Sequence, residues 1–291
     1  MKLLIVGNFH HKNQIGLKIL LEYLNWQYTF AGDNNINQCD INEFDIIYSP
    51  KKPIDTSKYP TKKFIFGPHF SVFPTSQLTH INNIHKNSIY IHPSPWSRDV
   101  WKNKNAEIYL PIKSFPFPVD TEKFTPIDNT SNNKNKIFIY FKRRNPNELS
   151  FIKKYLNNKN IEYRVFNYSQ RYNENDYLNY LKECRYGIWV GCHESQGFAL
   201  EEALSCNVPL LVWNTQYMCQ EYGTNYEKIP CTTISYWDER CGEYFYQQGE
   251  FENKYDEFLS KLDTYQPRQY ILDDFSLKKC AERWNKLISD I

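Results

Sequence analysis

Short continuous apolar runs alternate with stretches of helical periodicity along most of the chain. The first run, residues 2–6, ends at Gly7, and apolar side chains then recur at helical spacing over residues 15–24. Unbroken apolar runs are typical of parallel strands that are covered on both faces. Three more such runs lie at residues 45–48, 63–66 and 88–91. Strand, glycine turn and helix predict a Rossmann-like unit at the start of the chain.

A polar stretch without apolar periodicity, residues 128–135, separates this region from a second alternating pattern. The second pattern predicts strands at 136–141, 163–166, 186–190 and 209–213, and helices at 147–156, 175–182 and 198–205. An amphipathic helix is expected over residues 275–288, whereas residues 235–258 have too little periodicity for an assignment. We therefore expect an α/β protein with domains at 1–127 and 136–274, a linker at 128–135, and a C-terminal helix within 275–291 that returns to the first domain.

Composition narrows the class of protein. The net charge is +2, and a dedicated nucleic-acid binder usually carries a marked basic excess, so a nucleic-acid partner is not expected. No apolar run is long enough to cross a bilayer, and the apolar start is too short for a signal peptide. The eight cysteines include no Cys-x-x-Cys pair, which favours free thiols in the cytoplasm over disulfides or a zinc site.

The segment Glu194-Ser-Gln-Gly-Phe-Ala-Leu-Glu-Glu202 follows a predicted strand and runs into a predicted helix. A helix that starts after a strand presents free N–H groups and the positive end of its dipole, which favour a diphosphate. Glu194 and Glu202 are carboxylates placed to accept hydrogen bonds from neutral sugar hydroxyls. The alternative for any two such acids is an ordinary pair on a surface helix.

The same segment resembles the Glu-x7-Glu donor-binding motif of retaining GT-B glycosyltransferases of family 4. Glu194, Gly197, Glu202, Ala203 and Pro209 match that pattern, whereas Asn207 replaces its usual glycine. The connector Phe117-Pro-Val-Asp-Thr-Glu-Lys-Phe-Thr-Pro126 resembles the segment that ends the N-terminal domain in this family. The resemblance implies a GT-B fold, in which two Rossmann-like domains face each other across a cleft.

The resemblance also implies roles for individual residues. Glu194 would contact the transferred sugar, and Glu202 would contact the ribose of the nucleotide. The backbone amides of Ser195, Gln196 and Gly197 would face the diphosphate. Tyr168 lies in a segment that follows a predicted strand and is expected near the nucleotide base.

Three consecutive cations, Lys142, Arg143 and Arg144, follow the first strand of the second domain. Cations at this position neutralise a leaving nucleoside diphosphate without a metal. The family has Gly-Arg here and a lysine near the place of Glu148, so the sequence leaves open which cation acts. A solvated basic turn is the alternative for any one of them. The chain contains no Asp-x-Asp motif, which favours a metal-independent reaction and no cofactor.

Acceptor-side candidates lie in the first domain. His69 follows a predicted strand, where the resembling family often has a histidine, and it is expected to be catalytic with Glu194 and Lys142. Asn8 and His11 lie in the first strand–helix loop.

The sequence thus predicts a metal-independent, retaining glycosyltransferase that moves a sugar from a UDP- or GDP-linked donor to a glycan or other hydroxyl acceptor. The alternatives are a nucleotide-sugar epimerase or hydrolase on the same fold, and a catalytically silent sugar- or nucleotide-binding protein.

Overall fold

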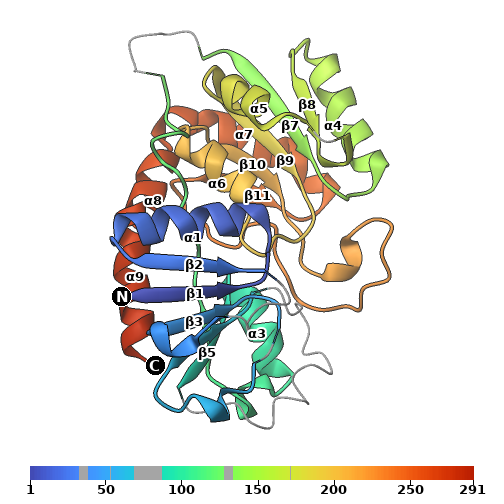
Figure 1. Cartoon of the computed structure of the whole chain (residues 1–291). Coiled ribbons are helices and arrows are strands. Elements are labelled where there is room, and N and C mark those ends of the chain that lie inside the picture. The colour runs from blue at the N-terminus through green and yellow to red at the C-terminus, as the bar shows by residue number, and fades with distance from the viewer. Residues whose placement is uncertain (33–38, 53, 69–86, 128–133, 171) are drawn as a thin grey trace. The chain divides into compact units, whose positions relative to one another are not determined.

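The computed structural model describes residues 1–32, 39–52, 54–68, 87–127, 134–170 and 172–291. The chain forms two compact units, of which unit 1 comprises Met1–Pro118 with Phe275–Ile291, and unit 2 comprises Val119–Asp274 (Figure 1). No helix within the described ranges is long and apolar enough to cross a membrane.

Unit 1 contains a six-stranded parallel sheet in the order β2-β1-β3-β4-β5-β6. Its strands are β1 (Lys2–Val6), β2 (Gln27–Ala31), β3 (Ile46–Ser49), β4 (Lys63–Phe66), β5 (Ser88–His92) and β6 (Ile112–Ser114). The strands predicted from continuous apolar runs are the buried central ones. Strands β2 and β6 were not predicted, because β2 exposes most of its side chains and β6 is only three residues long.

The helices of unit 1 include α1 (His11–Tyr23), α3 (Pro95–Asn103) and the C-terminal α9 (Leu277–Ser289). Helix α9 packs against α1 and buries Trp284 completely. The Trp284 ring lies 5.2 Å from the ring of Phe115. Lys63 Nζ also donates a hydrogen bond to the carbonyl oxygen of Ile288 at 2.6 Å. The last helix is therefore part of unit 1, although the whole of unit 2 separates it in sequence from the rest of that unit.

Unit 2 contains a five-stranded parallel sheet in the order β11-β10-β9-β7-β8. Its strands are β7 (Lys136–Phe141), β8 (Arg164–Asn167), β9 (Cys184–Val190), β10 (Leu210–Trp213) and β11 (Gly242–Phe245). Its helices are α4 (Pro146–Asn158), α5 (Glu174–Leu181), α6 (Phe198–Ser205), α7 (Phe251–Ser260) and α8 (Pro267–Asp274). Strand β11 and helix α7 occupy the region that the sequence left unassigned.

The connector before the second sheet belongs to unit 2, which differs from the expected domain end at residue 127. Ser205 Oγ donates to the carbonyl oxygen of Phe124 at 2.6 Å. The guanidinium of Arg268 donates to the carbonyl oxygens of Thr121, Phe124 and Ser205. These bonds tie the connector to the end of α6 and the start of α8. Most of the expected linker, residues 128–133, lies outside the described residues.

Candidate functional site

Both sheets reverse their strand order next to their first strand. In unit 2 the chain passes from β7 to β8 on one side and then returns to β9 on the other side of β7. Open α/β sheets bind ligands outside the carboxyl ends of the strands that flank such a reversal. In unit 2 these ends lead into the turn after β7 and the loop after β9. The predicted Lys142 and Glu194 lie in these two connections.

Backbone pairing continues past the ends of these strands. Lys142 N donates to Val190 O at 3.0 Å, and Cys192 N donates to Lys142 O at 3.0 Å. The turn after β7 is thereby fixed beside the loop after β9. This pairing places residue 142 close to residue 194, although 52 positions separate them in the sequence.

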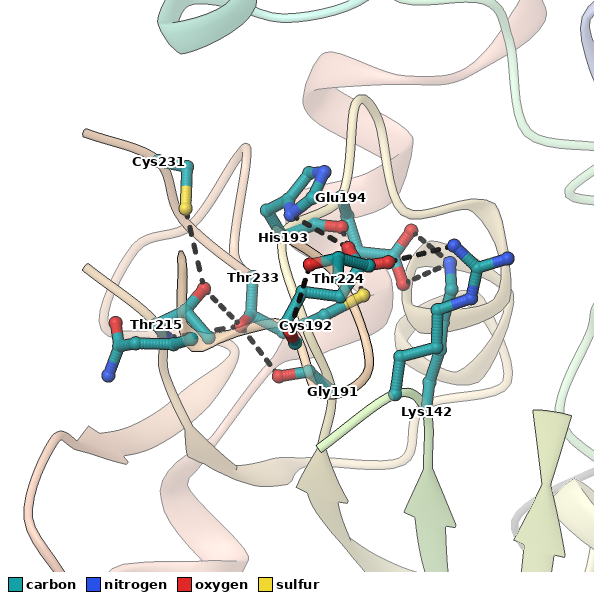
Figure 2. A network of polar contacts seen from close by, with 12 residues as sticks. Lys142, Gly191, Cys192, His193, Glu194, Thr215, Thr224, Cys231 and Thr233 are labelled. Atoms are coloured by element: carbon teal, nitrogen blue, oxygen red, sulfur yellow. Dashed lines mark hydrogen bonds and ion pairs between the residues drawn. The ribbon is translucent and has the colours of Figure 1, made fainter. Parts of the chain in front are cut away.

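The side chains of Lys142 and Glu194 form an ion pair, shown in Figure 2. Lys142 Nζ lies 2.8 Å from each carboxylate oxygen of Glu194, and the two side chains are only 17% and 12% exposed. Burial opposes the charged form of Lys142, but Glu194, together with Cys192 and Tyr168, raises the pKa of the ammonium above its ordinary value. A carboxylate oxygen carries two lone pairs, so a carboxylate can accept hydrogen bonds from more than one donor, sugar hydroxyls included.

Tyr168 lies beside this pair, in a short 3-10 helix (Tyr168–Gln170) that follows β8. Lys142 Nζ lies 4.7 Å from the centre of its ring, a cation–π distance. Tyr168 as a whole is 42% exposed and is therefore partly accessible to solvent next to the ion pair. A nucleotide base could stack on such a ring.

The loop between β9 and α6 is held by a segment that the sequence analysis did not single out. Glu194 N donates to Thr232 O at 3.1 Å, and Ser235 Oγ donates to Glu194 O. The side chain of Asn214 accepts from Thr233 N at 2.8 Å, and Thr233 Oγ1 donates to Gly191 O at 3.3 Å (Figure 2). The backbone of Glu194 is therefore fixed on both sides.

Gly197 is the residue that allows α6 to start where it does. It has φ +96° and precedes the first residue of the helix, a conformation that glycine adopts without strain. Gln196 is buried, and its amide donates to Glu201 Oε2 at 2.9 Å. Complete burial raises the pKa of Glu201 well above its usual value. With Ser195, these residues form the predicted diphosphate loop, which leads directly into the N-terminus of α6.

Glu202 lies within α6 and is 6% exposed. Burial raises the pKa of Tyr172 to about 12, and the negative charge of Glu202 acts in the same direction. The tyrosine and the glutamate are therefore close enough to interact electrostatically.

The two arginines after Lys142 are in different environments. Arg144 is 3% exposed and donates to both oxygens of Glu148, at 2.6 and 2.8 Å, and to the carbonyl oxygens of Gly191 and Trp213, at 3.2 Å. Arg144 thus joins the ends of β9 and β10 to α4 and is not part of a solvated basic turn. Arg143 is half-exposed, and its NH1 lies 2.8 Å from Glu221 Oε1.

Glu221 also lies close to two residues of the loop after β9. The ligand atoms of Cys192, His193 and Glu221 all lie within 4.8 Å of one another. These are residue types that bind metal ions, and the spacing in the sequence gave no indication that they would meet. All eight cysteines are free.

The acceptor-side candidates lie in unit 1. Asn8 is exposed directly after β1, beside the strand reversal of the first sheet. His11 begins α1 and lines a surface depression of about 390 Å³ together with Gln14, Ile15, Lys18, Tyr28 and Phe30. His69 lies outside the described residues.

No protein-family model matches the sequence, and no curated protein matches it. Solved structures do match over nearly the whole length of both chains. A sucrose-phosphate synthase from Thermosynechococcus elongatus has a TM-score of 0.61 at 10% identity, covering 98% of this chain and 97% of its own.

Two further structures are similar at the same level. The lipopolysaccharide outer core galactosyltransferase WaaB, in its apo form, has a TM-score of 0.55 at 12% identity over the full length of both chains. An alpha-glucosyltransferase in complex with UDP-glucose and DNA containing an abasic site has a TM-score of 0.54 at 10% identity, covering 99% of this chain and 98% of its own. These likenesses and the two parallel sheets identify the fold as GT-B, as the sequence predicted.

Proposed function

We propose that this chain is a glycosyltransferase that moves a sugar from a nucleoside-diphosphate sugar to a hydroxyl acceptor. The observation that carries the proposal is the Lys142–Glu194 ion pair at the strand reversal of the second sheet of a GT-B fold. At this position the ammonium of Lys142 can contact the phosphate of a donor, and the carboxylate of Glu194 can contact its sugar. The N-terminus of α6 follows Glu194 by four residues, and the positive end of a helix dipole favours a phosphate group.

In this proposal Glu194 accepts hydrogen bonds from hydroxyls of the transferred sugar, and Glu202 does so from the ribose. The backbone at Ser195, Gln196 and Gly197 holds the diphosphate. Lys142 and Arg143 neutralise the charge that develops on the leaving diphosphate, so that no metal is needed. Tyr168 offers its ring to the base. Arg144 is one of the three cations predicted at the diphosphate. Its guanidinium donates to Glu148 and to two backbone carbonyl oxygens, and in this proposal it stabilises the conformation of the site.

The reaction that we propose retains the anomeric configuration, as the resemblance to family 4 implies. The donor's own phosphate would take the proton of the acceptor hydroxyl, so no carboxylate nucleophile is required. Asn8, His11 and His69 of the first unit are the proposed acceptor-side residues. Free thiols in all eight cysteines suit a reducing compartment, and we place the protein in the cytoplasm.

Isothermal titration with UDP, GDP and ADP tests the proposal at its first step. One similar structure is a complex with UDP-glucose, which makes UDP the first probe. We expect one nucleotide to bind at micromolar to low millimolar concentration. Absence of binding by all three would contradict the proposal. Binding without turnover of the matching nucleotide sugar would favour a catalytically silent binding protein.

A further inference from the structure

A cysteine, a histidine and a glutamate from two separate loops meet directly beside Glu194. Cys192 and His193 precede Glu194 in the loop after β9 (Figure 2), and Glu221 lies in the loop after β10. Their ligand atoms, a thiol sulfur, a ring nitrogen and a carboxylate oxygen, all lie within 4.8 Å of one another. A tetrahedral zinc ion holds such atoms about 3.3 to 3.8 Å apart, so small side-chain rotations are enough to bring them to that spacing.

All three side chains are shielded from solvent. Cys192 is 2% exposed, the side chain of Glu221 is also 2% exposed, and that of His193 is 13% exposed. The two oxygens of Glu221 have different neighbours: Oε1 lies 2.8 Å from NH1 of Arg143, and Oε2 lies 3.1 Å from Nδ1 of His193. Carboxylates that bind metal ions are themselves held by hydrogen bonds, so Arg143 fixes Glu221 while Oε2 stays within reach of the cluster.

The backbone beside the three residues is fixed to a single turn, the one after β7. Cys192 N donates to Lys142 O at 3.0 Å, and Tyr222 N, next to Glu221, donates to Arg143 O at 2.8 Å. Both loops therefore keep their positions through backbone hydrogen bonds. A metal ion that binds there does not have to order either loop first, which lowers the free-energy cost of forming the site.

We propose that Cys192, His193 and Glu221 bind one Zn²⁺ ion, through the thiolate sulfur, a ring nitrogen and a carboxylate oxygen. These are the three ligand types that zinc takes in proteins, whereas Mg²⁺ and Ca²⁺ prefer oxygen ligands alone. The ion joins the loop after β9 to the loop after β10 and stabilises the folded chain. It takes no part in the proposed sugar transfer, because backbone hydrogen bonds hold both loops without it and Lys142 and Arg143 supply the charge at the diphosphate.

The charges around the cluster can balance a divalent ion. Burial opposes the bare thiolate of Cys192 and raises the pKa of its thiol. A bound zinc ion reverses this, because metal binding displaces the thiol proton into solvent. The thiolate and the Glu221 carboxylate then match the two positive charges of the ion. Of the nearby cations, Lys142 is paired with Glu194, and the side chain of Arg143 is 53% exposed, so that water weakens its repulsion of the ion.

The competing interpretation is a cluster without a metal. A buried thiol packs as a small apolar side chain and can donate a weak hydrogen bond. Cys192 Sγ lies 3.5 Å from the carbonyl oxygen of His193, which fits such a donor. The two interpretations differ in one observable property, a bond between the Cys192 sulfur and a metal ion, and that bond can be measured directly.

Cobalt substitution tests for that bond. The full chain is stripped of metal with EDTA, and Co²⁺ is then added, because it enters zinc sites and its absorption spectrum reports its ligands. We expect a sulfur-to-cobalt charge-transfer band in the near ultraviolet that saturates at one Co²⁺ per chain. The band should disappear when Zn²⁺, which thiolate ligands select, replaces the cobalt. Absence of the band, or a band that Zn²⁺ does not remove, would overturn the proposal.

Replacing single thiols shows which cysteine binds the ion. Cys192→Ser should lose the band and bind Zn²⁺ at least about 100-fold more weakly, since even the partners of metal ligands contribute about 10- to 100-fold to affinity. Competition with a chromophoric chelator measures the Kd. Cys219→Ser, which replaces an exposed thiol in the same loop as Glu221, is the matched control and should change neither the band nor the Kd. Equal affinity of Cys192→Ser and wild type, or loss of the band in Cys219→Ser, would mean an adventitious ion only and refute the site.

A second variant covers the case in which Cys192→Ser folds poorly. Glu221→Gln keeps the size of the side chain but not its charge, and it should weaken Zn²⁺ binding at least about 10-fold while the sulfur-to-cobalt band remains. An unchanged Kd for Zn²⁺ in Glu221→Gln would contradict the proposed ligand set.

Thermal unfolding of the wild type gives an independent readout. Zn²⁺ should raise the unfolding temperature, because a ligand that binds only the folded chain stabilises it, and Mg²⁺ at the same concentration should not. The same result with both ions, or with neither, would count against a zinc site. These measurements need no nucleotide. A chain that binds zinc at Cys192 but binds no nucleotide would refute the proposed function and support the zinc site.

Discussion

The ammonium of Lys142 lies 2.8 Å from both carboxylate oxygens of Glu194, so two of the three residues predicted to be catalytic are each other's partners. The sequence suggested that Lys142 faces the diphosphate and that Glu194 faces the sugar. Because the two side chains are in contact, a donor bound there would place its sugar beside Glu194 and its diphosphate beside Lys142 at the same time. Removing the charge of either residue should therefore change the free energy of unfolding as well as the enzymatic activity.

Replacing Lys142 by Met should destabilise the chain by about 2 kcal/mol, because it leaves the largely buried Glu194 carboxylate without its cation. Urea unfolding at pH 7 measures this free energy. Lys154→Met, on the exposed side of α4, is the matched control and should change stability by less than about 0.5 kcal/mol. Equal stability of the two variants would show that the ion pair contributes nothing.

Gly242→Ala should be one of the most damaging small substitutions in unit 2, costing about 3 kcal/mol or more. Gly242 has φ +133°, and a Cβ atom there would lie 2.0 Å from the carbonyl oxygen of Leu210 in the neighbouring strand. Gly249→Ala is the control, since nothing lies within 4 Å of a Cβ at that position. Thermal unfolding of both variants measures the difference in melting temperature. The prediction would be wrong if both variants melted at the temperature of the wild type.

The buried imidazole of His92 should make the stability of the folded chain depend on pH in the acidic range. Burial lowers its pKa to about 3, so the folded chain keeps the imidazole neutral while the unfolded chain binds a proton below about 6.5. The folded-state pKa is depressed, so this contribution is complete above pH 6.5 and is lost as the pH falls toward 3. Between pH 7 and pH 5 the loss should be about 2 kcal/mol.

His92→Leu removes the titrating group and should remove that part of the pH dependence. Urea unfolding of wild type and variant at pH 7 and pH 5 gives the four free energies needed. For each protein, the free energy of unfolding at pH 5 is subtracted from that at pH 7. A cost of the substitution that is the same at both pH values cancels in this difference. The same pH dependence in both proteins would exclude His92 as its source.

Nucleotide binding should survive removal of metal ions, because Lys142, Arg143 and the start of α6 supply the positive charge. After dialysis against EDTA, the Kd for the nucleotide that binds the wild type should change by less than about twofold. A loss of binding that Mg²⁺ or Zn²⁺ restores would contradict metal independence. Zn²⁺ alone restoring it would point to Cys192, His193 and Glu221.

The elements that the sequence predicted best are strands buried on both faces. Strands β1, β4 and β7 are unbroken apolar runs in the sequence because nearly all of their side chains, which alternate between the two faces of the sheet, are buried. Strand β2 was missed because its side chains are largely exposed at the sheet edge. Strand β11 was missed because Glu243 and Tyr244 interrupt its apolar pattern and Gly242 begins it.

The candidate site was predictable in its parts but not in its pairings. The loops that carry Lys142 and Glu194 could be placed after strands, yet their contact depends on β7 and β9 being neighbours, which only the strand order reveals. The position of Glu221 beside Arg143 and His193 could not be predicted from the sequence, because Glu221 does not directly follow a predicted strand or helix and belongs to no motif. Arg144 looked like Arg143 in sequence, and the carbonyls that bind it come from other strands.

The most direct test of the glycosyltransferase account is release of nucleoside diphosphate from UDP-, GDP- and ADP-sugars by wild type and by Glu194→Gln. The account predicts turnover of at least one sugar by the wild type and a loss of about 100-fold in Glu194→Gln. Glu252→Gln, an exposed acid on α7, should match the wild type. Turnover in Glu194→Gln equal to that of the wild type, or no turnover of any of these sugars, would contradict the account.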